Sequence, residues 1–161
     1  MELSKQTFVE QFGGVYEHSA WVAETAFEMG QPEPETLPAI MRQIVEDAGR
    51  APQLALLRAH PDLAGKLAKT GELTDESTSE QASAGLDQCT PNEFVEFTAL
   101  NERYKTRFGF PYILAVRGRH RTEILQNFKS RVGNTAEVEF REALDQVHQI
   151  ANLRFDAIFG G

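Results

Sequence analysis

The chain has 161 residues, of which 41% are hydrophobic and 25% are charged. These values are ordinary for a globular protein and exclude fibrous and intrinsically disordered classes. A chain of this length is expected to form a single domain over residues 1–161, with a core that needs no disulfide or metal. The formal net charge of −8 argues against nucleic acid as a partner, because the basic residues are scattered among a larger number of acidic ones.

The single cysteine, Cys89, leaves no internal disulfide and no zinc site built on cysteine. Residues 1–30 lack the basic start and apolar run of a secretory signal, and no window approaches the roughly 18 apolar residues of a membrane span. The C-terminal residues, Phe159-Gly160-Gly161, are not a peroxisomal signal. We therefore expect a cytoplasmic protein without a membrane partner.

The first part of the chain shows apolar residues at helical spacing, interrupted by glycine and proline. The expected helices cover residues 4–12 with Ser4 as N-cap, 19–30 with Ser19 as cap, 37–49, and 51–60. The fourth helix carries a stripe of leucines that ends in His60.

The second part of the chain is also predicted to be helical. The expected elements are a short helical piece at 63–68, an apolar-poor helix at 74–86, a helix at 91–108, a helix marked by Ile124, Leu125 and Phe128 that ends at Val132-Gly133, and a long last helix capped by Asn134-Thr135 and Glu137. Thr90 and Glu93 form a capping-box pattern, with Pro91 at the first helical position.

Between Gly109 and Gly118 the helical period is replaced by an aromatic and β-branched run that contains a proline. This pattern predicts an extended, buried segment. Because no partner strand is apparent elsewhere, we infer no sheet. The sequence therefore predicts an all-α, single-domain helical bundle of about eight helices with one extended insert near 109–118.

His60 stands at the end of an apolar helix and is followed by Pro61, which stops that helix. One explanation is structural, since a histidine there can bond the last helical carbonyls and interact favourably with the helix dipole. The other is catalytic, since imidazole exchanges protons near neutral pH. The local sequence leaves both open.

Arg154 occupies the apolar stripe of the last helix, together with Phe140, Leu144, Val147, Ala151 and Ile158. A guanidinium at such a position needs a carboxylate, backbone oxygens or an anionic ligand, since burial of an unpaired charge is costly. Alternatively, its stem lies on the apolar surface while its head reaches water near the C-terminus.

Glu80 also allows two interpretations. The segment Ser77-Thr78-Ser79-Glu80 has the pattern of a capping box, in which Glu80 would bond the amide of Ser77. Alternatively, this apolar-poor helix presents Ser77, Glu80 and Gln81 to a polar ligand. Other chemistry is not indicated, because the four histidines lack metal-site spacing and no phosphate-loop, dinucleotide or nucleophile-elbow motif is present.

Four separated segments carry a resemblance to a known family. They are residues 17–21 (EHSAW), 60–66 (HPDLAGK), 77–86 (STSEQASAGL) and 101–113 (NERYKTRFGFPYI). Together they closely resemble the 2-oxo-4-hydroxy-4-carboxy-5-ureidoimidazoline (OHCU) decarboxylases of urate degradation, over about Phe8 to Phe155. The resemblance implies an all-α carboxy-lyase that needs no cofactor, acts on a small ureidoimidazoline to give (S)-allantoin, and forms a homodimer in some members.

The resemblance also implies the roles of individual residues. His60 would be the proton donor, with Glu80 and Arg154 completing the catalytic group. Substrate contacts would come from Pro61, Ser77, Thr78, Ser79, Gln81, Phe110, Tyr112, Ile113, Leu114, Ala115 and Val116. We expect His60 and Glu80 to form a hydrogen-bonded pair at the substrate hydroxyl, while Arg154 holds polar oxygens of the ring or ureido group.

The chain departs from the family pattern at a few points. Arg107 and Tyr112 stand where lysine and phenylalanine would be expected, and the missing peroxisomal tripeptide suggests a bacterial, cytosolic member. Two alternatives stay open: a non-catalytic helical module that binds a ureide or a partner protein, and another cofactor-free lyase or hydrolase on the same scaffold.

Overall fold

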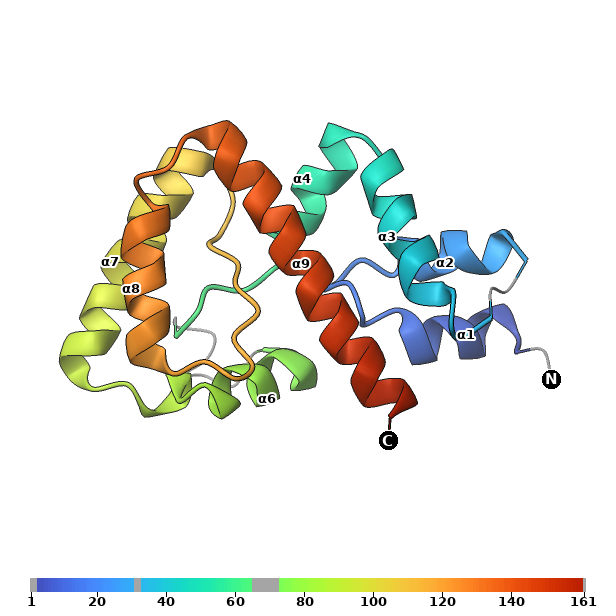
Figure 1. The fold of residues 1–161 in the computed structure, drawn as a ribbon, viewed down its shortest axis with the longest axis horizontal. Coiled ribbons are helices and arrows are strands. Elements are labelled where there is room, and N and C mark those ends of the chain that lie inside the picture. The colour runs from blue at the N-terminus through green and yellow to red at the C-terminus, as the bar shows by residue number, and fades with distance from the viewer. Residues whose placement is uncertain (1–2, 31–32, 65–72, 161) are drawn as a thin grey trace. The chain divides into compact units, whose positions relative to one another are not determined.

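The computed structural model describes residues 3–30, 33–64 and 73–160, and in these ranges the chain is helical without a strand (Figure 1). The elements are α1 (Lys5–Phe12), α2 (Trp21–Glu28), α3 (Leu37–Asp47), α4 (Arg50–Arg58), α6 (Asp75–Ser83), the 3₁₀ helix η1 (Leu86–Gln88), α7 (Pro91–Phe108), α8 (Arg121–Arg131) and α9 (Ala136–Phe159). The prediction of an all-α fold with about eight helices is confirmed. Among these helices, none combines the length and apolar character that crossing a membrane requires.

Two compact units make up the chain, and each is described by itself. The first comprises Met1–His60 and Val147–Gly161, and the second comprises Pro61–Gln146. Helix α9 contributes residues to both. The expectation that residues 1–161 form one domain stays a prediction.

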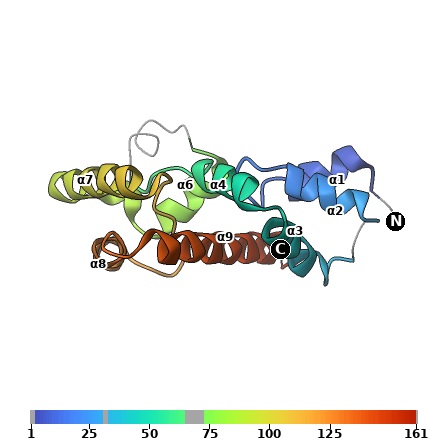
Figure 2. The ribbon, with the colours of Figure 1, turned by 90° about the horizontal axis from the view of Figure 1, so that it is seen from above.

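In the first unit, aromatic and aliphatic side chains from the short helices form the core. Helix α1 packs on α2, and α2 packs on α3 (Figures 1 and 2). The ring of Phe8 lies 4.9 Å from that of Phe12 and 5.6 Å from that of Phe27, and Phe12 reaches Phe155 of α9. Burial of these rings gives the short helices, which would be marginal alone, their stability.

The second unit is built around the extended segment, which leads from the end of α7 back to the start of α8 (Figure 1). Gly109, with a φ of +82°, ends α7 in the left-handed conformation that glycine allows. Residues 110–116 are all buried, and the Tyr112 ring stacks on that of Phe128 with 3.8 Å between centroids. The predicted extended, buried insert is therefore confirmed.

The predicted helix starts are confirmed at α1 and α7. The side chain of Ser4 accepts a hydrogen bond from the amide of Thr7. At α7 both halves of the capping box are present, with Thr90 and Glu93 each bonding the other's amide. These caps satisfy amides that the first turn of a helix leaves unpaired.

Two predicted caps are wrong. Ala20, not Ser19, is the N-cap of α2, because the Ser19 hydroxyl donates to the carbonyl of Glu17 instead. Helix α6 begins at Asp75, and the side chain of Thr74 accepts from the Ser77 amide. Since Ser77 already lies in the first turn, the capping-box interpretation of Glu80 is overturned.

The helical piece expected at 63–68 lies mostly outside the described residues. Leu63 and Ala64 form a turn, and Ala64 has a φ of +53°, which does not continue a right-handed helix. Residues 65–68 of this expectation, with Gly65 and Lys66 of the HPDLAGK motif, are not described.

Candidate active site

His60 lies two residues beyond the end of α4, and its side chain is buried, with 8% of the residue exposed. Its Nδ1 atom is 3.0 Å from the carbonyl oxygen of Leu56. A carbonyl only accepts hydrogen bonds, so Nδ1 carries the proton and donates. In the neutral ring, Nε2 is therefore the atom with a lone pair.

Several groups of the first unit set the protonation of His60. Its pKa is lowered to about 4, chiefly by burial; Glu17 and the bond to Leu56 act to raise it, whereas Arg154 and His18 act to lower it. The imidazole is thus neutral at pH 7. Because Glu17 and Arg154 both act on His60 electrostatically, the unit gathers a histidine, a carboxylate and a guanidinium.

Arg154 is held by two oxygens from the loop after α1. Its Nη1 donates to the carbonyl of Gly14 at 2.9 Å, and its Nη2 donates to Oε2 of Glu17 at 3.1 Å. The side chains of Arg154 and Glu17 are 5% and 2% exposed. The carboxylate and backbone oxygen that a buried arginine requires are therefore supplied by the chain itself.

Sequence reasoning assigned no role to Glu17, although it belongs to the EHSAW motif. The one signal in the sequence that pointed to a residue such as Glu17 was that a buried Arg154 requires a carboxylate. Nothing in the local spacing links these two residues, which are 137 positions apart.

A second buried chain of hydrogen bonds joins the same loop to α9. The hydroxyl of Tyr16 lies 2.9 Å from Nδ1 of His148, and Nε2 of His148 lies 2.9 Å from Oε2 of Glu46. His148 is 1% exposed. Residues 14–17 are thus bonded to α9 through Gly14, Tyr16 and Glu17.

In the second unit, Gln81 holds the segment that follows Pro61. Its Oε1 accepts from the Ala64 amide at 3.0 Å, and its Nε2 donates to the Asp62 carbonyl at 3.3 Å. Asn101 of α7 also donates, to the carbonyl of Leu63. Gln81 therefore has a structural task in addition to the predicted substrate contact, which stays a prediction.

The other expected residues of α6 differ in exposure: Ser77 is buried, Glu80 is half-buried, and Thr78 and Ser79 are exposed. Glu80 and all the predicted substrate contacts lie in the second unit, whereas His60 and Arg154 lie in the first. The structure brings His60 and Arg154 into one group, and the joint action of Glu80 with them stays a prediction.

The extended segment is fixed by an ion pair that sequence reasoning missed. Arg131 of α8 donates through Nη1 to the carbonyl of Ile113 at 2.6 Å and through Nε to Glu139 of α9 at 2.9 Å. Its guanidinium also lies over the ring of Tyr112, 4.6 Å from the centroid. Glu139 is fully buried and accepts from the hydroxyl of Tyr104 as well.

The amide of Ala115, also in the extended segment, donates to Oε1 of Gln146 at 2.9 Å. These interactions give the backbone of residues 113–115 a fixed course.

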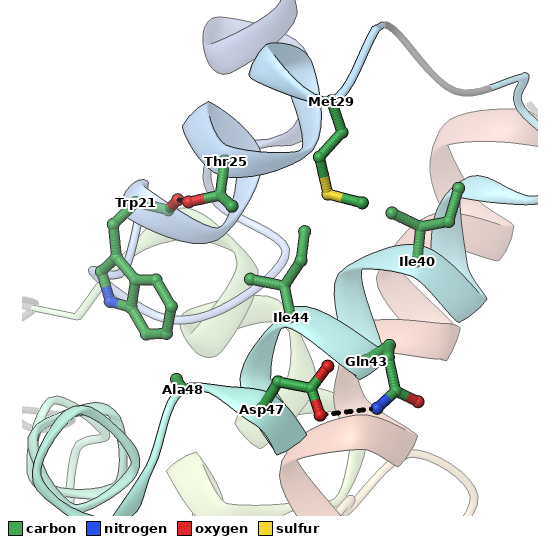
Figure 3. A pocket seen from close by; sticks show the side chains of 8 residues that line it. All are labelled: Trp21, Thr25, Met29, Ile40, Gln43, Ile44, Asp47 and Ala48. Carbon is green, nitrogen blue, oxygen red and sulfur yellow. Dashed lines mark hydrogen bonds between the residues drawn. The ribbon is translucent and has the colours of Figure 1, made fainter.

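A hollow of about 440 Å³ lies between α2 and α3 in the first unit (Figure 3). It is lined by Trp21, Thr25, Met29, Ile40, Gln43, Ile44, Asp47 and Ala48. Its one carboxylate, Asp47, accepts a hydrogen bond from Gln43. None of the predicted site residues lines this hollow, which is apolar and lacks a histidine, so the candidate site lies elsewhere.

The described residues define an all-helical protein whose first unit holds a buried, neutral histidine together with a buried ion pair. The model of the OHCU decarboxylase family matches residues 1–156, which include nearly all of both units. The chain belongs to the OHCU decarboxylase family.

Relatives and solved structures agree with this assignment. The chain is 46% identical to 2-oxo-4-hydroxy-4-carboxy-5-ureidoimidazoline decarboxylase of Haloferax volcanii over 154 residues, 94% of this chain and 89% of that protein. It is 34% identical to a crystal structure of (S)-allantoin synthase, with a TM-score of 0.76, covering 97% of this chain and 51% of the other. The chain thus spans about half the length of that synthase.

A crystal structure of OHCU decarboxylase in the presence of (S)-allantoin has a TM-score of 0.74 at 22% identity, and it covers 94% of this chain and 99% of the other. At this identity the likeness shows the shared fold. The fold and family expected from the four sequence motifs are therefore confirmed.

Proposed function

We propose that this chain is a carboxy-lyase that converts OHCU to (S)-allantoin in urate degradation. The observation that carries the proposal is the buried, neutral His60 beside Arg154, in a chain whose family match includes both residues. The name of the Haloferax volcanii relative gives the decarboxylation of OHCU, and the name of the similar solved structure, (S)-allantoin synthase, gives the product. The neutral imidazole supplies a base, and the guanidinium supplies N–H donors for polar oxygens of the substrate.

The chemistry of the substrate explains why no electron-withdrawing cofactor is needed. The carbon that carries the carboxylate also carries a hydroxyl and adjoins a C=N bond. When the bond to the carboxylate breaks and CO₂ leaves, its electron pair forms a new C=C bond and the C=N pair moves to nitrogen. The substrate therefore provides the electron sink that pyridoxal phosphate or thiamine diphosphate supplies elsewhere.

Two protons must then be placed, one on the ring nitrogen and one on the carbon that carries the ureido group. The hydroxyl supplies one as it becomes a carbonyl, and solvent supplies the other. In our proposal Nε2 of His60 takes the hydroxyl proton, Glu80 accepts a hydrogen bond from the resulting Nε2–H, and His60 then delivers a proton to one face of that carbon. This transfer determines the S configuration.

The remaining residues hold the substrate. Arg154 contacts polar oxygens of the ring or ureido group, while Pro61, residues 77–81 and the buried segment 110–116 orient the ring. The fixed course of 113–115 and the placement of Asp62–Ala64 by Gln81 support this assignment. The protein thereby lowers the entropic cost of bringing substrate and proton donor together.

The decisive experiment follows the handedness of allantoin made from enzymatically generated OHCU, because OHCU also decays spontaneously. Excess (S)-allantoin and a rate above the uncatalysed one support the proposal. A racemic product at the uncatalysed rate would contradict it and would favour the alternative of a non-catalytic ureide-binding module.

We further propose that the chain acts in the cytoplasm and as a homodimer. Fractionation of the native cells tests the first statement. Size-exclusion chromatography with light scattering tests the second, and a monomeric mass across micromolar concentrations would contradict it.

A further inference from the structure

Glu17 is the buried carboxylate bonded to Arg154, and the proposed reaction assigns it no task. The two side chains are 2% and 5% exposed, and Nη2 lies 3.1 Å from Oε2. Replacing a buried ion pair by apolar side chains is often neutral or stabilising. Stability alone therefore does not account for this pair.

The loop that carries Glu17 holds the carboxylate in a defined place. The Ser19 hydroxyl donates to the Glu17 carbonyl at 2.9 Å, and the neighbouring Tyr16 is bonded to His148 of α9. Gly14, three residues earlier, accepts from the same guanidinium as Glu17. Hydrogen bonds between the loop and α9 thus hold the ion pair in place.

We propose that Glu17 is a positioning residue that keeps Arg154 as a neutralised pair beside His60, so that this cation does not bind the carboxylate that the substrate must lose. The inference rests on the proposed function. A bare guanidinium fits a carboxylate well. In the absence of Glu17, the Arg154 guanidinium would bind the carboxylate of the substrate. In the transition state the negative charge has moved from this carboxylate into the ring, so the guanidinium would stabilise the substrate more than the transition state. Such ground-state binding slows a reaction.

The electrostatics at His60 agree with this role. The groups that face His60 in the first unit are Glu17 and His18 from the loop, the Leu56 carbonyl from α4 and Arg154 from α9. Glu17 raises the pKa of His60, whereas Arg154 lowers it. Loss of Glu17 would remove the larger of the two effects that raise the pKa of His60, and only the hydrogen bond to Leu56 would then oppose Arg154 and His18.

The kinetic test uses Glu17→Gln, which keeps the size of the side chain and removes its charge. We expect kcat to fall roughly tenfold while KM also falls several-fold, a combination typical of increased ground-state binding. The limb of the pH–rate profile that reports the ionisation of His60 should move to lower pH. A merely loosened loop would raise KM or leave it unchanged, and that result would overturn the proposal.

The control is Glu46→Gln, which also removes a carboxylate bonded to a buried side chain of α9 but is not among the groups that act on His60. It should leave KM and the pH–rate limb unchanged. If Glu17→Gln does not fold, Glu17→Asp withdraws the carboxylate by one methylene and should move the same quantities in the same direction by less. Wild-type values for the folded variant would overturn the proposal.

An NMR titration of His60 makes the test independent of turnover, with the signal assigned by His60→Gln. The midpoint should be lower in Glu17→Gln than in the wild type. A racemic product from the wild-type protein would overturn the proposed function, and the titration would then still decide whether Glu17 sets the charge balance at His60. An unchanged midpoint would overturn the role of Glu17.

Discussion

The Nδ1 atom of His60 lies 3.0 Å from the carbonyl oxygen of Leu56, one helical turn earlier in the chain. This is the hydrogen bond expected of a histidine that has a structural role at a helix end. It also fixes the tautomer, because only Nδ1–H can donate to a carbonyl. The structural and catalytic explanations are therefore compatible, since the helix holds one ring nitrogen and the other keeps its lone pair.

The first prediction concerns the pH dependence of stability. Burial lowers the pKa of His60 from 6.5 to about 4. Between these pH values the unfolded chain binds a proton that the folded chain does not, so stability falls as the pH decreases from about 6.5 to about 4. The full effect is on the order of 3 kcal/mol. Urea unfolding at a series of pH values should show it.

The control for this experiment compares two histidine substitutions. His60→Gln should remove most of the slope between pH 4 and 6.5. His120→Asn should retain it, because His120 is exposed and asparagine preserves an N-cap at the start of α8. Equal slopes in the wild type and His60→Gln would show that His60 is not the group responsible.

The second prediction concerns turnover. His60→Ala and Glu80→Ala should each lose about 10²–10⁴-fold in rate, the usual contribution of general acid–base catalysis. The assay is the rate of (S)-allantoin formation, with circular dichroism to verify that each variant is folded. Wild-type turnover in either folded variant would refute the role proposed for that residue.

The third prediction concerns the ion pair of Arg154 and Glu17. Arg154→Met should reduce the free energy of unfolding by about 3–5 kcal/mol, because it leaves a carboxylate buried without its partner. Combining it with Glu17→Leu should recover much of this loss, since both charges are then absent. Urea unfolding of the two single variants and the double variant measures the coupling. Simple additivity of the single losses would be inconsistent with the pair.

The fourth prediction concerns the extended segment. Glu139→Gln leaves Arg131 as a buried, uncompensated charge and should cost about 3–5 kcal/mol of stability. Because Arg131 also holds the carbonyl of Ile113, KM should rise. The control is Asp145→Asn, which breaks the exposed pair with Arg141 and should cost no more than about 1 kcal/mol. Similar losses in both variants would argue against the buried network.

The fifth prediction tests the start of α6. Thr74→Ala should reduce the free energy of unfolding by about 1 kcal/mol, because it removes the side chain that bonds the Ser77 amide. The matched control is Thr78→Ala, an exposed position in the same helix, with an expected change within about 0.5 kcal/mol. A larger loss in the control would mean that the helix begins elsewhere.

Local patterns in the sequence determined most of the fold. Helical spacing of apolar residues, the capping box at Thr90 and Glu93, and glycines at both ends of the insert act within a few residues, so they can be interpreted without the tertiary structure. Cap assignment failed at α6 because several neighbouring serines and threonines could each cap the helix, and the choice depends on which hydroxyl meets an unpaired amide. At α2 it failed because the Ser19 hydroxyl bonds the carbonyl of Glu17, which leaves Ala20 as an N-cap without a side-chain bond.

The sequence also identified His60 and Arg154 as unusual, and the structure places both in one buried group. Only the tertiary structure revealed their surroundings: Glu17 pairs with Arg154, Tyr16 bonds His148, and Arg131 pairs with Glu139 and holds Ile113. The first two contacts join residues more than 130 positions apart. The sequence alone indicates that a buried arginine needs a carboxylate. Which carboxylate it pairs with depends on how the helices pack, because ion pairs form between residues that are neighbours in space.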